Sequence, residues 1–326
     1  MGYMHEGEWH PGWYTADETG KFRREPSRFR DRISADGPSG HPAESDRYHL
    51  YVSFACPWAN RTLIVRKLMG LEGALDLSVV DPRMGEDGWV FRGRHPDDFD
   101  GSTEDRLEGR PRLQDVYRAA EPRYTGRVTV PVLFDRKARM IVNNESREIM
   151  RMFSKELRPL ATRGFDPCPE DLTEEVDGIL DAIYEPVNNG VYRAGFAKSQ
   201  QAYEEACQGL FAALDRWNEH LKSRRYLCGS RLTEADVALY TTLARFDLVY
   251  YSHFKCNIRR ITDYEHLFSY LCDLYQTPGF EENTRFDHIK VHYYWSQDNV
   301  NPTRIVPLGP SIDLTVPHGR DWLGTV

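Results

Sequence analysis

Residues 48–62 read YHLYVSFACPWANRT. Apolar or aromatic residues stand at every second position from Tyr48 to Phe54, which is typical of a β-strand. A helix is predicted from Pro57 through Leu68, because a proline suits the first helical turn, where no amide proton is needed. Gly70 is well placed to end that helix. The stretch therefore predicts a strand that leads directly into a helix.

Cys56 lies between this strand and this helix. The unpaired amides and the positive end of the helix dipole would face its sulfur, which lowers the pKa of a thiol. No second cysteine follows before Cys168, so a redox cycle at Cys56 needs an external thiol to complete it. Glutathione is the obvious candidate. The alternative is a cysteine that is simply buried for packing.

The other five cysteines are scattered along the chain, and none forms a Cys-x-x-Cys pair or a Cys/His set with metal-ligand spacing. A disulfide framework and a metal site are therefore not expected, and these residues are interpreted as small hydrophobic side chains. They are Cys168, Cys207, Cys228, Cys256 and Cys272.

The segments after the first helix continue an α/β pattern. Leu77 to Val80 is predicted as a second strand, and a long polar stretch over 83–127 follows it. Thr129 to Phe134 and Met140 to Val142 are predicted as two more strands, and Glu145 opens an amphipathic helix. This order of elements is that of a thioredoxin-like domain.

The pattern beyond the turn-rich residues 166–169 is helical nearly throughout. Thr233 and Asp236 have the form of a helix N-cap with an acidic partner at the third helical position, which is a folding device and not chemistry. The predicted helices cover about 173–187, 200–222, 233–249 and 263–276.

A chain of 326 residues is too long for one ordinary core, so two domains are expected. The first residues are rich in Gly, Pro, Arg and Trp without sustained periodicity and are predicted to form an extended arm over the fold. The predicted parts are an N-terminal arm (1–45), a thioredoxin-like domain (46–160) with a long 83–127 insertion, an all-helical domain (170–290) and a C-terminal extension (291–326).

The formal net charge of −8 gives no basic field that would attract nucleic acid. The chain has no apolar run that could span a membrane, and its first residues lack the apolar stretch of a signal peptide. A cytoplasmic protein is therefore expected, with neither nucleic acid nor membrane as a partner.

Two short motifs are ambiguous on their own. Val130-Pro131 stands at the start of a predicted strand, where the proline is either cis, leaving the preceding backbone free to pair with a peptide-like ligand, or a plain edge-strand proline. Glu145-Ser146 at a helix start offers a carboxylate for an ammonium, and a hydroxyl and amides for a carboxylate. These groups match the two charges of a γ-glutamyl group, although Glu-Ser is a simple capping pair in most proteins.

Taken together, the segments 53–62, 127–133 and 144–146 resemble the xi-class glutathione transferases, the S-glutathionyl-hydroquinone reductases. The element Cys56-Pro57-Trp58-Ala59 is much more specific than either short motif. The resemblance spans nearly the whole chain and continues in 188–196, 232–236, 245–247 with Tyr250, 253–256, 286–289, 292–294, 301–302 and 317–320.

This resemblance implies a fold, a site and partners. The fold is an α/β N-terminal thioredoxin-like domain followed by an all-α C-terminal helical domain of the glutathione-transferase type, in a homodimer. Cys56 is the implied nucleophile, and glutathione is the implied co-substrate. The implied glutathione contacts are Trp89, Arg127, Val128, Thr129, Val130, Glu145 and Ser146, and the tyrosines implied around the second substrate are Tyr192, Tyr250 and Tyr293.

The implied reaction is the glutathione-dependent reduction of S-glutathionyl-hydroquinones through a mixed disulfide on Cys56. Two alternatives are open. An omega-like thiol transferase or dehydroascorbate reductase needs the same cysteine but not the tyrosines. A non-catalytic scaffold of the same fold needs neither, and its thiol would be slow and unselective.

Overall fold

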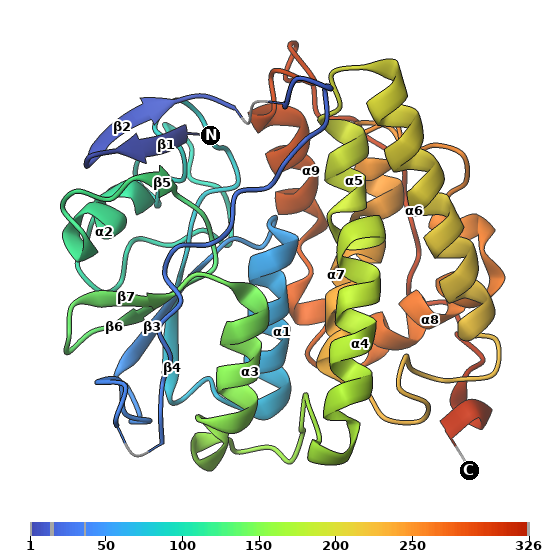
Figure 1. The fold of residues 1–326 in the computed structure, drawn as a ribbon, viewed down its shortest axis with the longest axis horizontal. Coiled ribbons are helices and arrows are strands. Elements are labelled where there is room, and N and C mark those ends of the chain that lie inside the picture. The colour runs from blue at the N-terminus through green and yellow to red at the C-terminus, as the bar shows by residue number, and fades with distance from the viewer. Residues whose placement is uncertain (1, 14–15, 36, 325–326) are drawn as a thin grey trace. The chain divides into compact units, whose positions relative to one another are not determined.

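A computed structural model describes residues 2–13, 16–35 and 37–324, which form two compact units (Figure 1). Each unit collects separate stretches of the chain. The first unit comprises residues 2–13, 25–35, 37–165 and 287–296, and the second comprises 16–24, 166–286 and 297–324.

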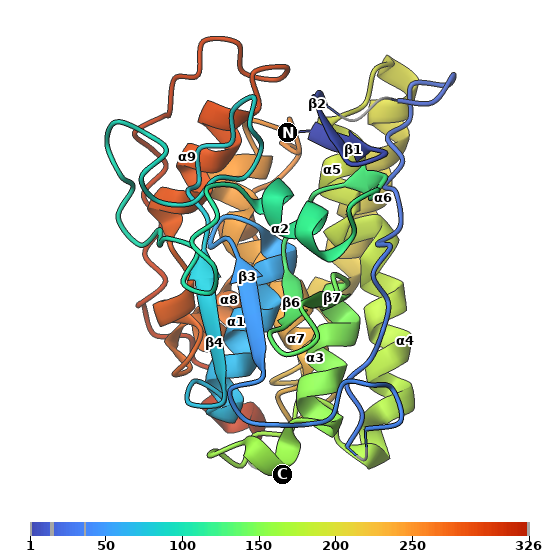
Figure 2. The same cartoon turned by 90° about the vertical axis from the view of Figure 1, so that its left-hand side faces the viewer.

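The first unit is built on a four-stranded sheet with the order β4-β3-β6-β7. Its strands are β3 (Tyr48–Val52), β4 (Leu75–Val79), β6 (Val132–Asp135) and β7 (Met140–Asn143). Strand β3 pairs parallel with β4 and antiparallel with β6, which pairs antiparallel with β7. Helices α1 (Pro57–Met69) and α3 (Ser146–Lys155) cover one face of the sheet (Figure 2). The predicted thioredoxin-like domain is confirmed.

The predicted start and end of the first helix are also confirmed. Pro57 is the first residue of α1, and Gly70 ends the helix in the left-handed conformation, with φ 70°. Its amide donates to the carbonyl oxygens of Arg66 and Lys67, and the Leu71 amide also donates to the Arg66 carbonyl (2.9 Å), which satisfies acceptors that the helix itself leaves unpaired at its end.

The segment 83–127 covers the other face of the sheet and is not a free loop. All five residues of β3 are buried, including those between the alternating apolar positions. The Tyr51 hydroxyl donates to Asp105 Oδ1 (3.0 Å), and its ring lies 5.7 Å from that of Phe91. The segment also contains helix α2 (Leu113–Ala120), which its polar composition did not predict. When both faces of a strand are covered, its residues are buried continuously and not at alternate positions.

Residues 2–11 form a β-hairpin and not the extended arm expected from the sequence. Strands β1 (Gly2–His5) and β2 (Glu8–Pro11) join β5 (Gly126–Arg127) in a small sheet of order β2-β1-β5 (Figure 1). Two residues with positive φ, Glu6 and Gly7, make the turn, as a tight hairpin requires. Glu is an unusual residue there, so the turn gave no signal in the sequence.

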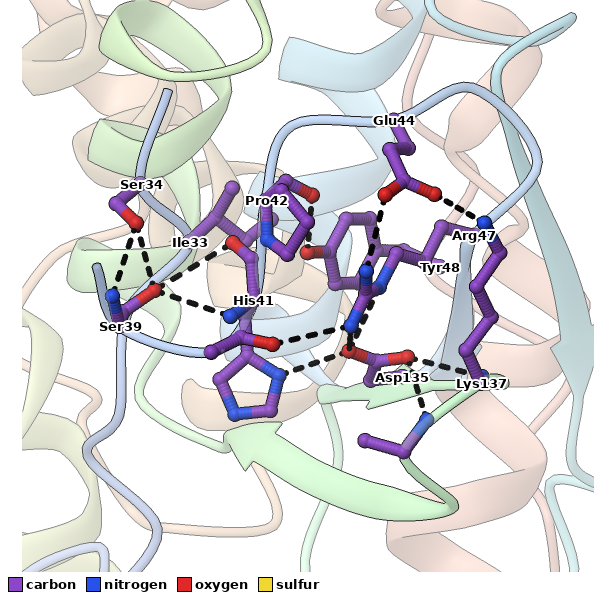
Figure 3. A network of polar contacts seen from close by, with 12 residues as sticks. Ile33, Ser34, Ser39, His41, Pro42, Glu44, Arg47, Tyr48, Asp135 and Lys137 are labelled. Atoms are coloured by element: carbon purple, nitrogen blue, oxygen red, sulfur yellow. Dashed lines mark hydrogen bonds and ion pairs between the residues drawn. The ribbon is translucent and has the colours of Figure 1, made fainter. Parts of the chain in front are cut away.

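A buried carboxylate ties residues 41–47 to the end of β6 (Figure 3). Asp135 accepts hydrogen bonds from Arg47 Nε (2.9 Å) and His41 Nδ1 (2.8 Å), and from the amides of Lys137 and Ala138. Burial by itself would raise the pKa of Asp135, but these hydrogen bonds outweigh it and hold the pKa below its ordinary value. Because a buried carboxylate needs all of these partners, it fixes the position of residues 41–47 against the end of β6.

The second unit is helical, as predicted. Its α-helices are α4 (Thr173–Ile183), α5 (Gly190–Gly195), α6 (Gln200–His220), α7 (Glu234–Arg245) and α8 (Glu265–Gln276). Figure 1 shows α5 continuing above α4, with α6 beside them. The π-helical segments η3 (Tyr184–Asn188) and η4 (Phe246–Tyr250) prolong α4 and α7. Short 3₁₀ turns lie at Glu170–Leu172, Ile261–Asp263, Glu281–Asn283 and Asp321–Gly324, and in the first unit at Arg158–Leu160.

The start of α7 confirms the predicted capping motif. The Thr233 side chain accepts from the third helical amide, and the Asp236 carboxylate accepts from the Thr233 amide (2.8 Å). Helix α9 (Phe286–Ser296) was not predicted; its residues 287–296 group with the first unit. No helix among the described residues is long and apolar enough to cross a membrane.

Candidate active site

Cys56 occupies the N-cap position of α1, as the sequence predicted. Its backbone is extended (φ −75°, ψ 121°), and its carbonyl accepts the first helical hydrogen bond, from the Asn60 amide (2.9 Å). The sulfur lies 3.5 Å from the carbonyl oxygen of Val130, within reach of a weak S–H···O hydrogen bond. The side chain is partly exposed. A thiol at this position meets the amides that begin a helix.

The other five cysteines are buried, in contrast to Cys56. Burial raises the pKa of Cys228 to about 12 and that of Cys272 to about 11, and it raises the pKa of Cys207 and Cys256 as well. A thiol that stays protonated is a poor nucleophile. Their interpretation as packing residues fits this burial.

The Val130–Pro131 peptide bond is cis, so the first of the two alternatives for this motif is the one observed. Strand β6 begins one residue after Pro131, at Val132, and not at Thr129 as predicted, because a proline has no amide proton to give to the ladder. Among the described residues, the Val130 amide has no hydrogen-bond acceptor. Val130 thus offers a backbone donor next to the carbonyl that faces Cys56.

Glu145 and Ser146 begin α3, as predicted. Glu145 is the N-cap residue, and its carboxylate accepts from the Arg147 amide (3.4 Å). The Ser146 hydroxyl is buried, yet it has no hydrogen-bond partner in the described part of the chain. An unpaired buried hydroxyl costs free energy unless a ligand or water satisfies it. The predicted role of this hydroxyl, to meet a polar group of the ligand, stays a prediction.

Ser27, in the N-terminal arm, also contacts Glu145. The Ser27 hydroxyl lies 3.1 Å from Glu145 Oε2 and 3.2 Å from the Asn144 carbonyl oxygen. The backbones of Phe29 and Asn144 are also joined by a hydrogen bond (3.1 Å). Ser27 was not predicted, because no local pattern in the sequence links residue 27 to residue 145.

Trp89 and Arg127 both lie in the first unit. The Trp89 ring is buried and stacks on His292 of α9, with ring centroids 4.6 Å apart and planes 18° from parallel. The Arg127 guanidinium donates to the carbonyl oxygens of Gly12 (3.2 Å) and Trp13 (3.3 Å). The arm therefore fixes the guanidinium that the family resemblance assigns to glutathione.

Tyr117 on α2 organises the segment that carries Val128, Thr129 and Val130. Its hydroxyl donates to the Thr129 carbonyl (2.8 Å) and accepts from the Thr129 amide (3.2 Å). The same hydroxyl accepts from Asn144 Nδ2 (3.1 Å). The side chain of Val128, the residue before Thr129, is buried. One phenol thus links the strand start near Cys56 to the start of α3, and the sequence carried no sign of it.

Tyr192 and Tyr250 belong to the second unit, where their ring centroids are 6.0 Å apart. Phe254 lies 5.5 Å from each of them, stacked on Tyr250 and edge-on to Tyr192. Both tyrosines stand at π-helical segments, since η4 ends at Tyr250 and η3 leads into α5, which carries Tyr192. Such segments are rare and often occur at functional sites.

Tyr293 lies on α9 and groups with the first unit, which also holds Cys56. The ring is almost completely buried and contacts that of His292 at 5.3 Å.

Within the described residues, no group of three or more His, Cys, Asp or Glu side chains could hold a metal ion.

Two family models match the sequence, the glutathione S-transferase N-terminal domain over residues 55–156 and the C-terminal domain over residues 200–271. Glutathionyl-hydroquinone reductase YqjG of Escherichia coli is 50% identical, covering 98% of this chain and 99% of that protein. Glutathionyl-hydroquinone reductase PcpF of Sphingobium chlorophenolicum is 45% identical, covering 96% and 98%. Glutathione S-transferase omega-like 2 of Schizosaccharomyces pombe is 48% identical, covering 91% and 95%.

Among solved structures, the xi-class glutathione transferase of Natrialba magadii is 49% identical, with a TM-score of 0.92 over 99% of this chain and 97% of that one. The chain belongs to the xi-class glutathione transferases. The glutathione-bound structure of YqjG is similar to this xi-class chain too, with 48% identity and a TM-score of 0.89 over 98% and 99% of the two chains.

The predicted fold class and family are both confirmed for this xi-class chain. The roles of its individual site residues stay predictions. Cys56, Trp89, Arg127, Glu145, Ser146 and Tyr293 all belong to the first unit, together with the segment 128–130, whereas Tyr192 and Tyr250 belong to the second.

Proposed function

We propose that this xi-class chain reduces S-glutathionyl-hydroquinones to hydroquinones, with glutathione as the reductant and oxidised glutathione as the second product. The observation that carries the proposal is the partly exposed Cys56 sulfur at the start of α1, 3.5 Å from the Val130 carbonyl. Two relatives that match over nearly their whole length bear the name of this activity.

In the proposed complex, the substrate's glutathionyl peptide pairs with the Val130 backbone. Its γ-glutamyl end meets the Glu145 carboxylate and the unpartnered Ser146 hydroxyl. An ammonium complements the carboxylate, and a carboxylate complements the hydroxyl and the amides at the start of α3. Trp89, Arg127, Val128 and Thr129 complete the glutathione contacts that the family resemblance implies.

The first chemical step breaks the bond between the glutathione sulfur and the aromatic carbon. The Cys56 thiolate attacks the glutathione sulfur and forms a disulfide with it, and the carbon keeps the electron pair of the broken bond. That carbon needs a proton, which one of Tyr192, Tyr250 and Tyr293 supplies or helps to place. Hydroquinone leaves, and Cys56 carries glutathione as a mixed disulfide.

The second step restores the thiolate. A second glutathione, as its thiolate, attacks the glutathione sulfur of the mixed disulfide and leaves as oxidised glutathione. Its thiol proton replaces the one given to the product, so each turnover consumes one glutathionyl-hydroquinone and one glutathione. The reaction needs no metal in this scheme. The homodimer and the cytoplasmic location implied by the sequence stay predictions here.

A direct experiment tests the reaction and its intermediate together. The purified chain is mixed with the glutathione conjugate of 1,4-benzohydroquinone and excess glutathione, and hydroquinone and oxidised glutathione are quantified. Without added glutathione, mass spectrometry should find one glutathionyl group on Cys56 and none on the buried cysteines. No turnover, or turnover without the Cys56 adduct under single-turnover conditions, would refute the proposal.

An omega-like thiol transferase is the second candidate, because relatives such as the Schizosaccharomyces pombe protein carry that name at 48% identity. It uses the same cysteine on dehydroascorbate or glutathionylated proteins. Turnover of dehydroascorbate that exceeds turnover of the glutathionyl-hydroquinone would favour this second candidate. A scaffold would turn over neither and would alkylate slowly at Cys56.

A further inference from the structure

Residues 19–22 of the N-terminal arm are fixed on the helical unit. The Lys198 amide donates to the Gly20 carbonyl (2.9 Å), and the Ser199 hydroxyl donates to the Thr19 carbonyl (3.0 Å). Lys21 pairs with Glu205 on α6 at 2.5 Å. These contacts set the register of the segment on α5 and α6, so the side chains that follow have defined positions.

Phe22 and Arg24 contact a cluster of rings formed by Tyr192, Phe196, Tyr250 and Phe254. The Phe22 side chain is buried, with its ring 5.4 Å from that of Phe196 at the end of α5. The Arg24 guanidinium carbon lies 4.8 Å from the centroid of the Tyr192 ring, and its Nε donates to Asn189 Oδ1 (3.0 Å). Asn189 is the residue immediately before α5, so a cation is held over one particular tyrosine.

A cation over the face of a phenol ring stabilises negative charge on that ring. A phenol that donates a proton or a strong hydrogen bond acquires such charge in the transition state, so the cation strengthens it as a donor. Lys21 pairs with Glu205, and Arg193, on the same helix as Tyr192, pairs with Glu185 (3.7 Å).

We propose that Arg24 is a positioning residue that holds Tyr192 in place and makes its hydroxyl a stronger proton donor to the departing hydroquinone. This inference rests on the proposed reductase function and selects one of its three tyrosines. It also gives the arm a part in the chemistry, since residue 24 lies far along the chain from Tyr192.

A double-mutant cycle tests the proposal with the glutathione conjugate of 1,4-benzohydroquinone. Arg24→Met should lower kcat about 3- to 10-fold and leave the KM for glutathione unchanged, because Arg24 acts through a tyrosine and not on glutathione. Arg24→Lys keeps the positive charge and should recover most of the loss. In a Tyr192→Phe background, Arg24→Met should cost less than about twofold, since the hydroxyl it assists is gone.

Arg23→Met is the matched control, because Arg23 is highly exposed and pairs with Asp17 of its own segment. It should behave as the unaltered chain. Three results would overturn the role of Arg24. They are losses in kcat that multiply in the double variant, an unchanged kcat in Arg24→Met, and a KM for glutathione that changes together with kcat in Arg24→Met. If Arg24→Met lowers the melting temperature, Arg24→Lys and Arg24→Gln are compared instead at equal stability.

Wild-type turnover and the Cys56 adduct are measured in the same series. If both are absent, the proposed function fails and the Arg24 proposal fails with it. If both are present and the cycle shows no coupling between Arg24 and Tyr192, the Arg24 proposal alone is overturned.

Discussion

The unit that holds Cys56 and the unit that holds Tyr192 offer a substrate opposite chemistry. In the first, the candidate groups are polar and sit at the beginnings of elements: Cys56 at the start of α1, Val130 before β6, and Ser146 at the start of α3. In the second, Tyr192, Tyr250 and their neighbours form a buried cluster of rings. In the proposed function, the first unit receives the charged peptide and the second the flat aromatic ring.

The difference shows how the two kinds of recognition are encoded. Backbone amides and caps need few particular side chains, and each of these stands beside the start of a strand or helix. The ring cluster draws Phe22, Tyr192 and Phe254 from three distant stretches. A contrast of this kind can be tested by removing one group from each side at a time.

Cys56→Ser should give the largest effect. We expect kcat for the glutathionyl-hydroquinone to fall at least about 10³-fold, because a hydroxyl is a poor nucleophile towards sulfur. The side chains are nearly isosteric, so glutathione affinity, measured by calorimetry, should be kept. Cys272→Ala serves as control, since burial keeps the Cys272 thiol protonated, with a pKa of about 11. Full activity in Cys56→Ser would remove the basis of the whole comparison.

The polar half was the predictable one. Cys56, Pro131 and Ser146 were identified from residue type and from the predicted start of a strand or helix beside each, although the strand beside Pro131 begins at Val132 and not at Thr129. Ser27 and Tyr117 contact the same segments but were missed, because their partners are 118 and 12 residues away and only the folded chain brings them together. Tertiary contacts leave no local pattern.

The aromatic half was accessible by resemblance alone. With 18 tyrosines in the chain, spacing does not distinguish a substrate contact from a core ring. Helix α5 is too short to show a helical period, so the element that carries Tyr192 was not predicted. Helix α9 was missed as well, and its Tyr293 groups with the other unit.

Tyr192→Phe should give the second largest effect and should separate the two candidate reactions. We expect kcat for the glutathionyl-hydroquinone to fall about 10- to 100-fold, because the carbon leaving group loses its proton donor. Dehydroascorbate turnover, which needs the cysteine but not the tyrosines, should change less than about twofold. Tyr293→Phe is the companion variant. Equal losses on both substrates would show that Tyr192 supports the fold and not the proton transfer.

Ser146→Ala should act on binding and not on chemistry. The hydroxyl has no partner among the described residues, so its removal costs the chain no internal hydrogen bond. A lost hydrogen bond to a charged ligand group raises the KM for glutathione about 10-fold, with kcat within about twofold. Ser154→Ala, on the same helix, should leave the KM unchanged. An unchanged KM in Ser146→Ala would mean that the peptide binds elsewhere.

Gly195→Ala should give the smallest effect on activity, acting through the packing of the ring cluster. A Cβ at residue 195 would lie 2.2 Å from the Phe254 ring, so the ring next to Tyr192 and Tyr250 must move. We expect the free energy of unfolding, measured in urea, to fall by about 1–3 kcal/mol, and kcat to fall less than about fivefold.

Gly209→Ala in the middle of α6 is the matched control, since a Cβ there meets nothing within 4 Å. Because alanine favours a helix interior over glycine, this variant should be more stable by about 0.5–1 kcal/mol. If both variants gain stability, the Phe254 ring has room to shift, and the cluster is then an adaptable wall for the second substrate. If Gly195→Ala alone loses stability together with kcat for the hydroquinone, the rings are a rigid part of the site.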